Sequence, residues 1–245
     1  MSGEHNDKVA AVTGAGRGIG AGIAARLAED GFHVALIDID ETTVGNAADE
    51  IGRDRATPYV VDLAKRQDVI DTFSEVARAH GRIDAVVNNA MWVHYSPIIE
   101  MDERSLDTMW TIGLKAAFWT IQGAYPAMIA QGGGVVVNMS SPAATRGIDG
   151  SSGYSAVKGA VSSLTWQAAR ELGPQGIRVN GIIPGAVDTP GARRVVDDEG
   201  YEIRRKMSTL GRLATAEDIA AGVSFLVSPD AAYVNGHILN VDGAL

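Results

Sequence analysis

The sequence predicts an α/β fold built on a parallel, doubly wound sheet. Short apolar runs alternate with segments that have apolar residues at helical spacing. A glycine-rich turn, 14–20, joins the first run to the first helical segment. Hydrophobic residues make up 46% of the 245 positions, which is enough for a substantial core. No linker, internal repeat or low-complexity segment interrupts the alternation, so we expect one domain over 1–245.

Charge and composition exclude several classes of function. The formal net charge of −9 argues against a nucleic-acid partner and against an anionic membrane surface. The chain has no cysteine, which excludes disulfides, thiolate metal sites and a thiol nucleophile. The polar start, MSGEHNDKVA, does not read as a signal peptide, and no apolar run reaches the ~18 residues of a membrane span. We therefore expect a cytoplasmic protein without a bound metal.

The first predicted strand and helix flank the glycine-rich turn. Lys8–Thr13 (KVAAVT) is a short apolar run typical of a buried strand. The turn has the spacing G-x-x-x-G-x-G, and the segment after it, AGIAARLAEDG, is predicted to be a helix that ends at Gly31. Glycines let the backbone approach a pyrophosphate closely, with the helix N-terminus behind it. The turn indicates a dinucleotide site, with a purely structural turn as the alternative.

A carboxylate ends the second predicted strand, His33–Asp38 (HVALID). Asp38 lies about 20 residues after the glycine turn, where a dinucleotide site places an acid against the adenosine ribose. A carboxylate accepts hydrogen bonds from ribose hydroxyls and repels a 2′-phosphate, so we expect NAD rather than NADP. Arg17 argues the other way, because a guanidinium binds phosphate well. The structural alternative for Asp38 is a cap on the next helix.

The alternation continues to about residue 88. The predicted elements are a helix over Thr42–Arg53, a strand over Ala56–Asp62, a helix over Lys65–His80 and a strand over Ile83–Asn88. Asp62 and Leu63 follow the third strand, where they are expected to contact the adenine ring. Asp62 is also a candidate N-cap for the following helix, and the two roles are compatible.

The second half of the chain completes the pattern. Met101–Ala130 is predicted to be mostly helical, and its aromatic residues are assigned to the core or to a subunit interface. These are Trp110, Phe118, Trp119 and Tyr125. The remaining predicted elements are strands over Gly134–Met139, Ile177–Ile183 and His237–Val241, and helices over Tyr154–Leu172 and Ala216–Val227. Trp166, on the helix over Tyr154–Leu172, is assigned to packing.

Tyr154 and Lys158 are four residues apart and therefore share one face of their predicted helix. A phenol titrates near ~10, and a nearby cation lowers that pKa. Lowering it to ~7 requires about 4 kcal/mol, much of which one ammonium supplies where water is excluded. Ser141 follows a predicted strand and is placed to donate a hydrogen bond to a carbonyl or alkoxide oxygen beside the phenol. A Tyr-x-x-x-Lys pair taken alone also occurs by chance.

Together, these motifs resemble the short-chain dehydrogenase/reductase family. The resemblance spans nearly the whole chain and rests on Gly14/Gly18/Gly20, Asn88-Asn89-Ala90, Ser141, Tyr154-x-x-x-Lys158 and Pro184-Gly185. It implies a single Rossmann-type domain, a seven-stranded parallel sheet in a three-layer α/β/α arrangement, and a nicotinamide cofactor. It also implies that Tyr154 is the acid/base, Lys158 holds the nicotinamide ribose and lowers the tyrosine pKa, and Ser141 positions the substrate oxygen. The thirteen-residue step from Ser141 to Tyr154 matches the family and favours Ser141 over Ser140.

The resemblance extends to the cofactor residues. Pro184–Thr189 resembles the segment that orients the nicotinamide, with Val187 near the carboxamide and Thr189 hydrogen-bonded to it. Asp242-Gly243 resembles the family's C-terminal signature. The expected cofactor-binding residues are Gly14, Arg17, Gly18, Ile19, Gly20, Asp38, Asp62, Leu63, Asn89, Ala90, Tyr154, Lys158, Pro184, Gly185, Val187 and Thr189.

Two positions depart from the family's pattern. Met91 replaces the glycine of Asn-Asn-Ala-Gly, and a thioether there is expected to narrow the pocket and make it more apolar. Gly113 replaces an asparagine thought to hold a water that relays protons through the lysine. A glycine inside a helix costs ~1 kcal/mol relative to alanine. We expect a water to fill the vacated volume, so that Gly113→Asn keeps turnover similar or raises it.

The substrate mouth is predicted just past the fourth strand, where ligands bind in such sheets. Trp92 and His94 are expected substrate contacts rather than catalysts, and Val93 and Tyr95 lie beside them. The expected substrate residues are Met91, Trp92, His94, Ser141, Ala143, Ile148 and Tyr154. The charged stretch 190–210 is the family's usual place for a mobile lid. Its cations are Arg193, Arg194, Arg204, Arg205 and Lys206, which read as a solvated surface or, alternatively, as a site for an acidic substrate or acyl-carrier partner.

These observations predict an NAD-dependent alcohol dehydrogenase/ketone reductase. Tyr154 takes the hydroxyl proton while C4 of NAD accepts hydride, and Ser141 stabilises the oxyanion. The apolar mouth favours a cyclic, aromatic or terpenoid secondary alcohol. One alternative is an NADP-dependent 3-oxoacyl-[acyl-carrier-protein] reductase. Another is a non-catalytic nucleotide-sensing or scaffold protein, which the two departures favour and the intact Ser/Tyr/Lys set opposes. The family resemblance implies a homotetramer.

Overall fold

Seven parallel strands form one sheet in the order β3-β2-β1-β4-β5-β6-β7 in the computed structural model, which describes residues 8–244. The strands are β1 (Val9–Thr13), β2 (His33–Asp38), β3 (Ala56–Val60), β4 (Ala85–Asn88), β5 (Gly134–Met139), β6 (Ile177–Pro184) and β7 (Ile238–Val241). The chain reverses its direction of winding between β1 and β4. Ligands bind at such a switch point, outside the carboxyl ends of the strands. The predicted doubly wound, seven-stranded sheet is confirmed.

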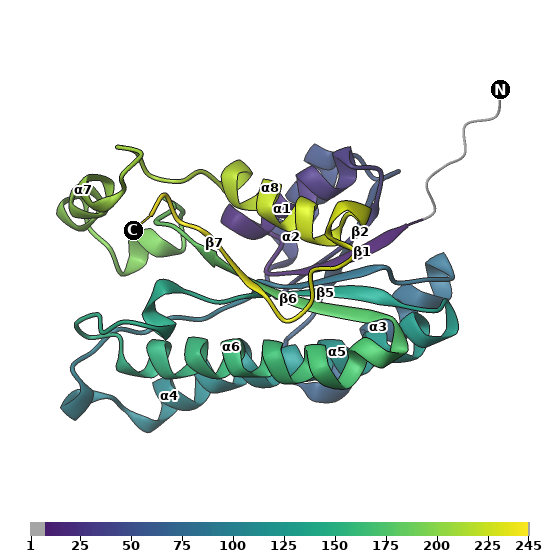
Figure 1. Cartoon of the computed structure of the whole chain (residues 1–245), viewed down its shortest axis with the longest axis horizontal. Coiled ribbons are helices and arrows are strands. Elements are labelled where there is room, and N and C mark those ends of the chain that lie inside the picture. Colours follow the sequence, from purple (N-terminus) through teal and green to yellow (C-terminus); the bar gives the residue numbers. More distant parts are fainter. Residues whose placement is uncertain (1–7, 245) are drawn as a thin grey trace.

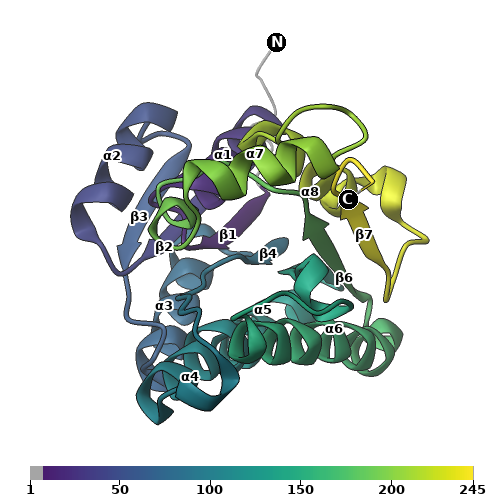
Figure 2. The same cartoon turned by 90° about the vertical axis from the view of Figure 1, so that its left-hand side faces the viewer.

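Helices cover both faces of the sheet and give three layers. They are α1 (Gly18–Glu29), α2 (Glu41–Ile51), α3 (Arg66–His80), α4 (Glu103–Trp110), α5 (Ala116–Ala130), α6 (Ser152–Leu172), α7 (Asp198–Met207) and α8 (Ala216–Val227). Figure 1 shows α1, α2 and α8 on one face and α3 to α6 on the other. Figure 2 looks onto the carboxyl ends of the strands, with α7 in the foreground.

Each face of the sheet has its own hydrophobic core, because alternate residues of a strand point to opposite sides. In β1, Ala10 and Val12 pack into the core under α1 and α8, whereas Val9 and Ala11 pack into the core under α3 and α5. A strand buried on both faces reads as a continuous apolar run, which is why KVAAVT predicted β1 correctly.

Buried polar side chains tie β4 and β5 to the helices below them. Thr120 Oγ1 donates to Asn88 Oδ1 at 2.6 Å, and Asn88 Nδ2 donates to Asn138 Oδ1 at 2.8 Å. Asn138 Nδ2 then donates to Thr165 Oγ1 at 3.0 Å. Each buried polar group is therefore satisfied by another, and the chain of bonds fixes the strand ends that carry the site.

Several predicted boundaries differ from the structure. The third strand ends at Val60 rather than Asp62, and α3 begins at Arg66 with Lys65 as its N-cap. The predicted helix over Met101–Ala130 is divided, because a π-helical turn over Thr111–Lys115 separates α4 from α5. The charged stretch after residue 190 contains the helix α7, which the sequence did not predict. Among residues 8–244, no helix is both long and apolar enough to cross a bilayer.

Candidate active site

The predicted serine and tyrosine meet at the carboxyl end of β5. Ser141 caps a short 3₁₀ turn, and its Oγ accepts a hydrogen bond from the Ala143 N–H at 3.2 Å. The Ser141 hydroxyl also hydrogen-bonds the Tyr154 phenol, which lies in the first turn of α6. Both side chains thus present an oxygen to the same point in space. That pair of oxygens is able to hold one substrate oxygen between them.

The neighbouring serine has a different task. Ser140 Oγ lies 2.7 Å from Ser162 Oγ and donates to the Lys158 carbonyl, so it joins β5 to α6. Its hydroxyl is committed to the interior. This placement agrees with the spacing argument that favoured Ser141.

Lys158 is buried beneath the tyrosine, with 4% of its surface exposed. Its Nζ donates to the Met139 carbonyl at 2.6 Å and lies 5.7 Å from the centroid of the Tyr154 ring. Burial lowers the pKa of Lys158 to about 8, because a charged ammonium is costly in a low-dielectric interior. The ammonium approaches the ring of the phenol, and the β5 carbonyl anchors it.

The pKa of Tyr154 moves in the opposite direction from the sequence prediction. Burial raises it to about 12, the hydrogen bond from Ser141 lowers it, Tyr95 raises it further and the positive charge of Arg204 lowers it. Tyr95 packs edge-on against Tyr154, with 5.8 Å between ring centroids, and contributes to the enclosure. Desolvation outweighs the Ser141 hydrogen bond and the Arg204 charge in this structure, so the phenol holds its proton at neutral pH.

The glycine turn has the backbone geometry of a phosphate cradle. Gly14 and Gly18 have φ of +65° and +60°, values that side chains rarely adopt. A Cβ on Gly20 would lie 2.0 Å from the Gly14 carbonyl oxygen, so this close approach also requires glycine. The turn ends at the N-terminus of α1, whose N–H groups point out of the helix. The loop therefore fits the pyrophosphate of a dinucleotide.

Asn89 and Ala90 hold this cradle from the next strand along the sheet. Asn89 Nδ2 donates to the carbonyls of Thr13 at 3.0 Å and Gly14 at 3.2 Å. The Ala90 N–H donates to Thr13 Oγ1 at 3.1 Å. The Asn89 side chain, predicted to bind the cofactor, is thus committed to the loop that forms the cradle.

Asp38 is fixed beside the glycine turn by three backbone donors. Its Oδ2 accepts from the Gly16 N–H at 3.0 Å, and its Oδ1 accepts from the N–H groups of Ile39 at 2.8 Å and Asp40 at 3.2 Å. Asp40, not Asp38, caps α2 by accepting from Thr43. The alternative role of Asp38 as the helix cap is therefore wrong. Arg17 is exposed at the N-cap of α1.

Two predicted adenine contacts have other roles in the structure. Asp62 Oδ1 accepts from the Ala64 N–H at 3.0 Å, so it caps the turn before α3 rather than α3 itself. The Leu63 side chain is buried in the core shared with α3. The Leu63 side chain therefore packs in the interior, and its adenine contact stays a prediction.

The segment after β6 lies against the glycine turn, and Thr189 is the residue that comes close to Gly18. A Cβ on Gly18 would lie 3.3 Å from the Thr189 Cβ. Thr189 Oγ1 accepts from the Ala192 N–H at 3.2 Å, and its hydroxyl hydrogen is left to donate to a carboxamide. Val187 is buried, and Gly185 is held by the Val241 carbonyl at 2.8 Å. These placements fit a nicotinamide between the glycine turn and Tyr154.

Comparison with known proteins agrees with this architecture. A family model described as Enoyl-(Acyl carrier protein) reductase matches residues 14–245. D-threitol dehydrogenase of Mycolicibacterium smegmatis is 36% identical over 96% of this chain and 92% of its own length. The chain belongs to the short-chain dehydrogenase/reductase family.

Two solved structures have the same fold. One, assigned as an NAD(P)-dependent gluconate 5-dehydrogenase from Beutenbergia cavernae with NADP at low occupancy, has a TM-score of 0.91 and 35% identity, covering 96% of this chain and 95% of its own. The other, 3-ketoacyl-(acyl-carrier-protein) reductase from Brucella melitensis complexed with NADH, has a TM-score of 0.92 and 31% identity, covering 97% and 98%.

The two departures from the family pattern contact each other. Gly113 lies in the π-helical turn, and a Cβ there would lie 2.6 Å from both Met91 Sδ and Val157 Cγ1. The predicted water in this volume is wrong, because the Met91 thioether occupies it. The sulfur packs into the helix layer beside Tyr154. Met91 and Gly113 are complementary in volume, so the second departure makes room for the first.

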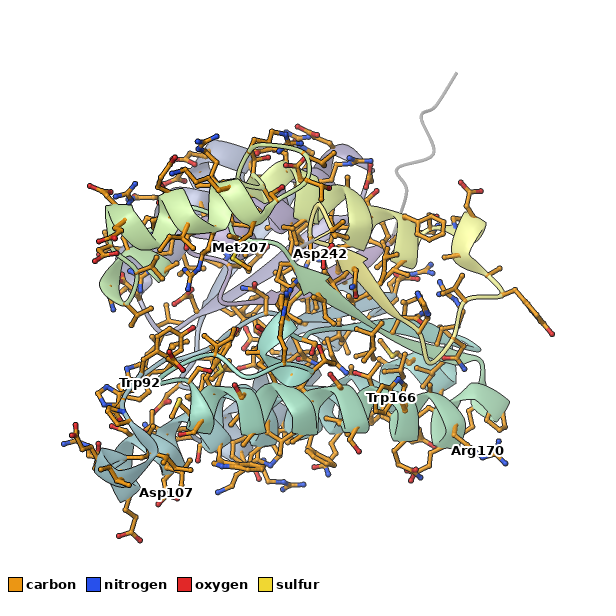
Figure 3. All side chains as sticks on the ribbon, turned by 60° about the vertical axis from the view of Figure 1, so that its left-hand side comes forward. Trp92, Asp107, Trp166, Arg170, Met207 and Asp242 are labelled. Atoms are coloured by element: carbon orange, nitrogen blue, oxygen red, sulfur yellow. The ribbon has the colours of Figure 1, made fainter. Side chains whose placement is uncertain are left out.

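The substrate mouth is partly aromatic. Trp92 is 40% exposed and stacks on His94, with 6.0 Å between ring centroids. Figure 3 shows Trp92 at the end of the molecule between the upper and lower layers. Ala143 and Ile148 line a cavity of about 570 Å³ that runs along the loop after Ser141. That cavity is lined by neither Ser141 nor Tyr154, but it includes their chain neighbours Ala143 and Ser155, so it adjoins the predicted catalytic pair without containing it.

The sequence missed Tyr201 and the lid helix that carries it. Tyr201 is 5% exposed, and its hydroxyl reaches the Val187 carbonyl at 3.5 Å. The Arg193 guanidinium lies 5.1 Å from the centroid of its ring. The sequence does contain a signal for this helix, because Asp197 is a favourable N-cap residue, acids follow it in the first turn and cations lie in the last turn. α7 therefore docks on the segment expected to orient the nicotinamide.

Proposed function

We propose that this short-chain dehydrogenase/reductase uses NAD to interconvert a hydrophobic secondary alcohol and its ketone. The hydrogen bond between Ser141 and Tyr154 is the observation that supports the proposal most directly. It brings together the two hydroxyl groups that a reacting alcohol or carbonyl oxygen needs. Trp92, Ala143 and Ile148 near this point favour a cyclic, aromatic or terpenoid body.

Each residue has a defined task in the oxidation. The Tyr154 oxygen accepts the hydroxyl proton of the alcohol, and Ser141 Oγ donates a hydrogen bond to the oxygen as negative charge develops on it. Lys158 holds a positive charge beneath the phenol ring and, with it, favours phenolate. Thr189 and Tyr154 would hold a nicotinamide between them, and that group would supply the hydride acceptor and, in its oxidised form, a further positive charge.

The pH dependence follows from the tyrosine. Because burial places the pKa of Tyr154 near 12, only a small fraction is phenolate at neutral pH. Oxidation is expected to accelerate as pH rises from 6 toward the phenol's apparent pKa in the cofactor complex, and reduction to slow. Initial rates in both directions across this range measure the effect. A flat profile for oxidation would count against Tyr154 as the base.

NAD is the proposed cofactor because Asp38, at the end of β2, is fixed beside the glycine turn, where a dinucleotide site has an acid against the ribose. Its carboxylate is held in place by three N–H donors and would repel a 2′-phosphate. The two solved relatives differ in this respect, since one was solved with NADP and the other with NADH. The ratio of kcat/KM for the two cofactors tests the proposal. A preference for NADP would indicate instead that the exposed Arg17 binds the 2′-phosphate of the ribose.

The experiment that tests the function is a panel of hydrophobic secondary alcohols mixed with enzyme and NAD. NADH fluorescence reports turnover directly, and growth of signal supports the proposal. Reduction of a 3-oxoacyl thioester is the second candidate, favoured by the likeness to the Brucella reductase. That candidate predicts NADPH-dependent activity on an acyl thioester and none on the alcohols. Cofactor binding without turnover across both panels would indicate a nucleotide sensor.

We also propose that the chain assembles as a homotetramer. Phe118 on α5 and Trp166 on α6 are exposed aromatic residues of one helical layer, with Trp166 55% exposed. This exposure corrects the assignment of Trp166 to packing, and Figure 3 shows it on the outer face of α6. Large apolar side chains at a surface favour burial against a partner. Light scattering of the purified protein tests the assembly.

A further inference from the structure

The lid helix α7 presents one cation on its inward face. Tyr201 is the buried residue of this helix and marks the face that packs against the molecule. Arg204 lies three residues later and therefore shares that face. The Arg204 side chain is half-buried, whereas Arg205 and Lys206 are exposed. Helix periodicity thus separates Arg204 from the cations that follow it.

Arg204 also differs from the other lid cations in its partners. Arg193 forms ion pairs with Asp188 and Asp198. Arg205 and Lys206 both pair with Glu202, and Arg194 is exposed. Among residues 8–244, no hydrogen bond or ion pair to the Arg204 guanidinium is present. A partly desolvated cation without a counter-charge is unfavourable unless a ligand supplies one.

The charge of Arg204 reaches the catalytic tyrosine. Burial is the main effect on the pKa of both Tyr95 and Tyr154 and raises it, and at both residues the Arg204 charge acts in the opposite direction. Tyr201 also feels this charge, against the larger effects of burial and Asp188. Together with its place on the inward face of α7, this effect puts Arg204 within electrostatic reach of all three phenols. A substrate held at Tyr154 would lie within the same reach.

We propose that Arg204 binds a carboxylate on the substrate, so that the enzyme acts on a hydroxy acid or oxo acid with an otherwise apolar body. The planar guanidinium matches a carboxylate in a bidentate geometry, and such charge-assisted pairs are among the stronger hydrogen bonds in proteins. The aromatic mouth at Trp92 contacts the rest of the substrate. This inference rests on the proposed function and narrows its substrate class.

The test compares an acid with its neutral ester. The probes are 3-hydroxy-3-phenylpropanoate and its methyl ester, each with NAD and the wild-type enzyme, Arg204→Ala or the matched control Arg205→Ala. We expect Arg204→Ala to lower kcat/KM for the acid by about 10–100-fold, mainly through KM, since a hydrogen bond to a charged group is lost. The kcat/KM for the ester is expected to change by less than about 3-fold. Arg205→Ala, which breaks an exposed ion pair with Glu202 and an exposed hydrogen bond to the Gly211 carbonyl, is expected to change kcat/KM for neither probe. Arg204→Lys should recover part of the loss.

A binding measurement separates this proposal from the proposed function. The Kd of the acid for the enzyme–NADH complex is measured by quenching of NADH fluorescence, and Arg204→Ala should weaken it by the same factor as kcat/KM. If neither probe is oxidised but acid binding depends on Arg204, the anion site stands and the proposed activity fails. Three results would overturn the carboxylate site. They are an equal fall of kcat/KM for the acid and the ester in Arg204→Ala, no binding of the acid to the wild-type enzyme–NADH complex, and an unchanged Kd of the acid in Arg204→Ala.

Discussion

Two regions of the site are held in place by different interactions. We call them the floor, which is Met91, Gly113, Ser141, Tyr154 and Lys158, and the lid, which is the stretch 190–210 with α7. On the floor, Lys158 is buried, its Nζ donates to a strand carbonyl at 2.6 Å, and Met91 fills the space over Gly113. In the lid, α7 buries one side chain, Tyr201, and its cations mostly form ion pairs at the surface. The floor is held by packing and desolvated hydrogen bonds, and the lid by interactions that water screens.

This difference separates the chemistry from the choice of substrate. Exposed ion pairs are each worth about 0–1 kcal/mol, so apart from the buried Tyr201 little holds α7, and we expect it to open more readily than the floor, as the proposed lid would require. The floor tolerates no such movement, because proton transfer requires the Ser141 and Tyr154 oxygens within hydrogen-bond distance of the reacting oxygen. Substitutions on the floor should therefore change turnover and stability strongly, and those in the lid should mainly change substrate affinity.

The largest effect is expected from removing the phenol oxygen. Tyr154→Phe keeps the ring that packs against Tyr95 and should fold normally. We expect kcat to fall by about 10²–10⁴-fold, the usual contribution of a positioned acid/base. NADH binding, measured by fluorescence titration, should remain within about 2-fold of wild type because the cradle is untouched. Appreciable residual turnover would remove Tyr154 from its role.

Lys158→Met is expected to stabilise the fold while it inactivates the enzyme. The pKa of Lys158 is lowered by burial from 10.5 to about 8, which corresponds to about 3 kcal/mol of native-state cost at neutral pH. Between pH 8 and 10.5 the unfolded chain binds this proton and the native protein does not, so the free energy of unfolding rises with pH. Lys158→Met should lack this rise, so its free energy of unfolding should exceed that of wild type most below pH 8. The loss of the hydrogen bond to the Met139 carbonyl reduces this gain.

Urea unfolding at pH 7 and pH 10 measures this effect. Lys115→Met, at an exposed lysine, controls for the loss of a surface charge. A stability difference between Lys158→Met and wild type that stays constant with pH would show that the buried ammonium carries no such cost.

A glycine comparison tests the packing of the floor. Gly113→Ala places a Cβ 2.6 Å from Met91 Sδ and Val157 Cγ1, so we expect a loss of about 1–3 kcal/mol and lower turnover. Gly159→Ala, where the nearest atom to a Cβ is 3.9 Å away, should instead stabilise α6 by about 0.5–1 kcal/mol. Met91→Ala combined with Gly113→Ala should recover part of the lost stability, since the conflict with Val157 remains. Equal effects of the two glycine substitutions would rule out the proposed volume match.

The sequence predicted the elements whose signal is local. The apolar run of β1, the glycine turn and the spacing from Ser141 to Tyr154 are each decided within a few residues, and the structure agrees with them. The contact between Met91 and Gly113 joins positions that are far apart in the sequence, so each read as an isolated departure. The pKa of Tyr154 was predicted in the wrong direction for the same reason. Its enclosure involves Tyr95, which lies far away along the chain, and no spacing rule brings the two rings together.

The smallest effect on stability is expected in the lid. Arg193→Ala removes two exposed ion pairs and the cation over Tyr201, so the midpoint of thermal unfolding should change by less than about 2 °C. KM should nevertheless rise by about 2–5-fold, because the same pairs hold α7 against the segment that orients the nicotinamide. Arg212→Ala, which breaks an ion pair with Asp218 outside the lid helix, should leave KM unchanged. If both variants change KM equally, or if Arg193→Ala lowers the unfolding midpoint as strongly as Gly113→Ala, then lid and floor are one cooperative unit and the division between them fails.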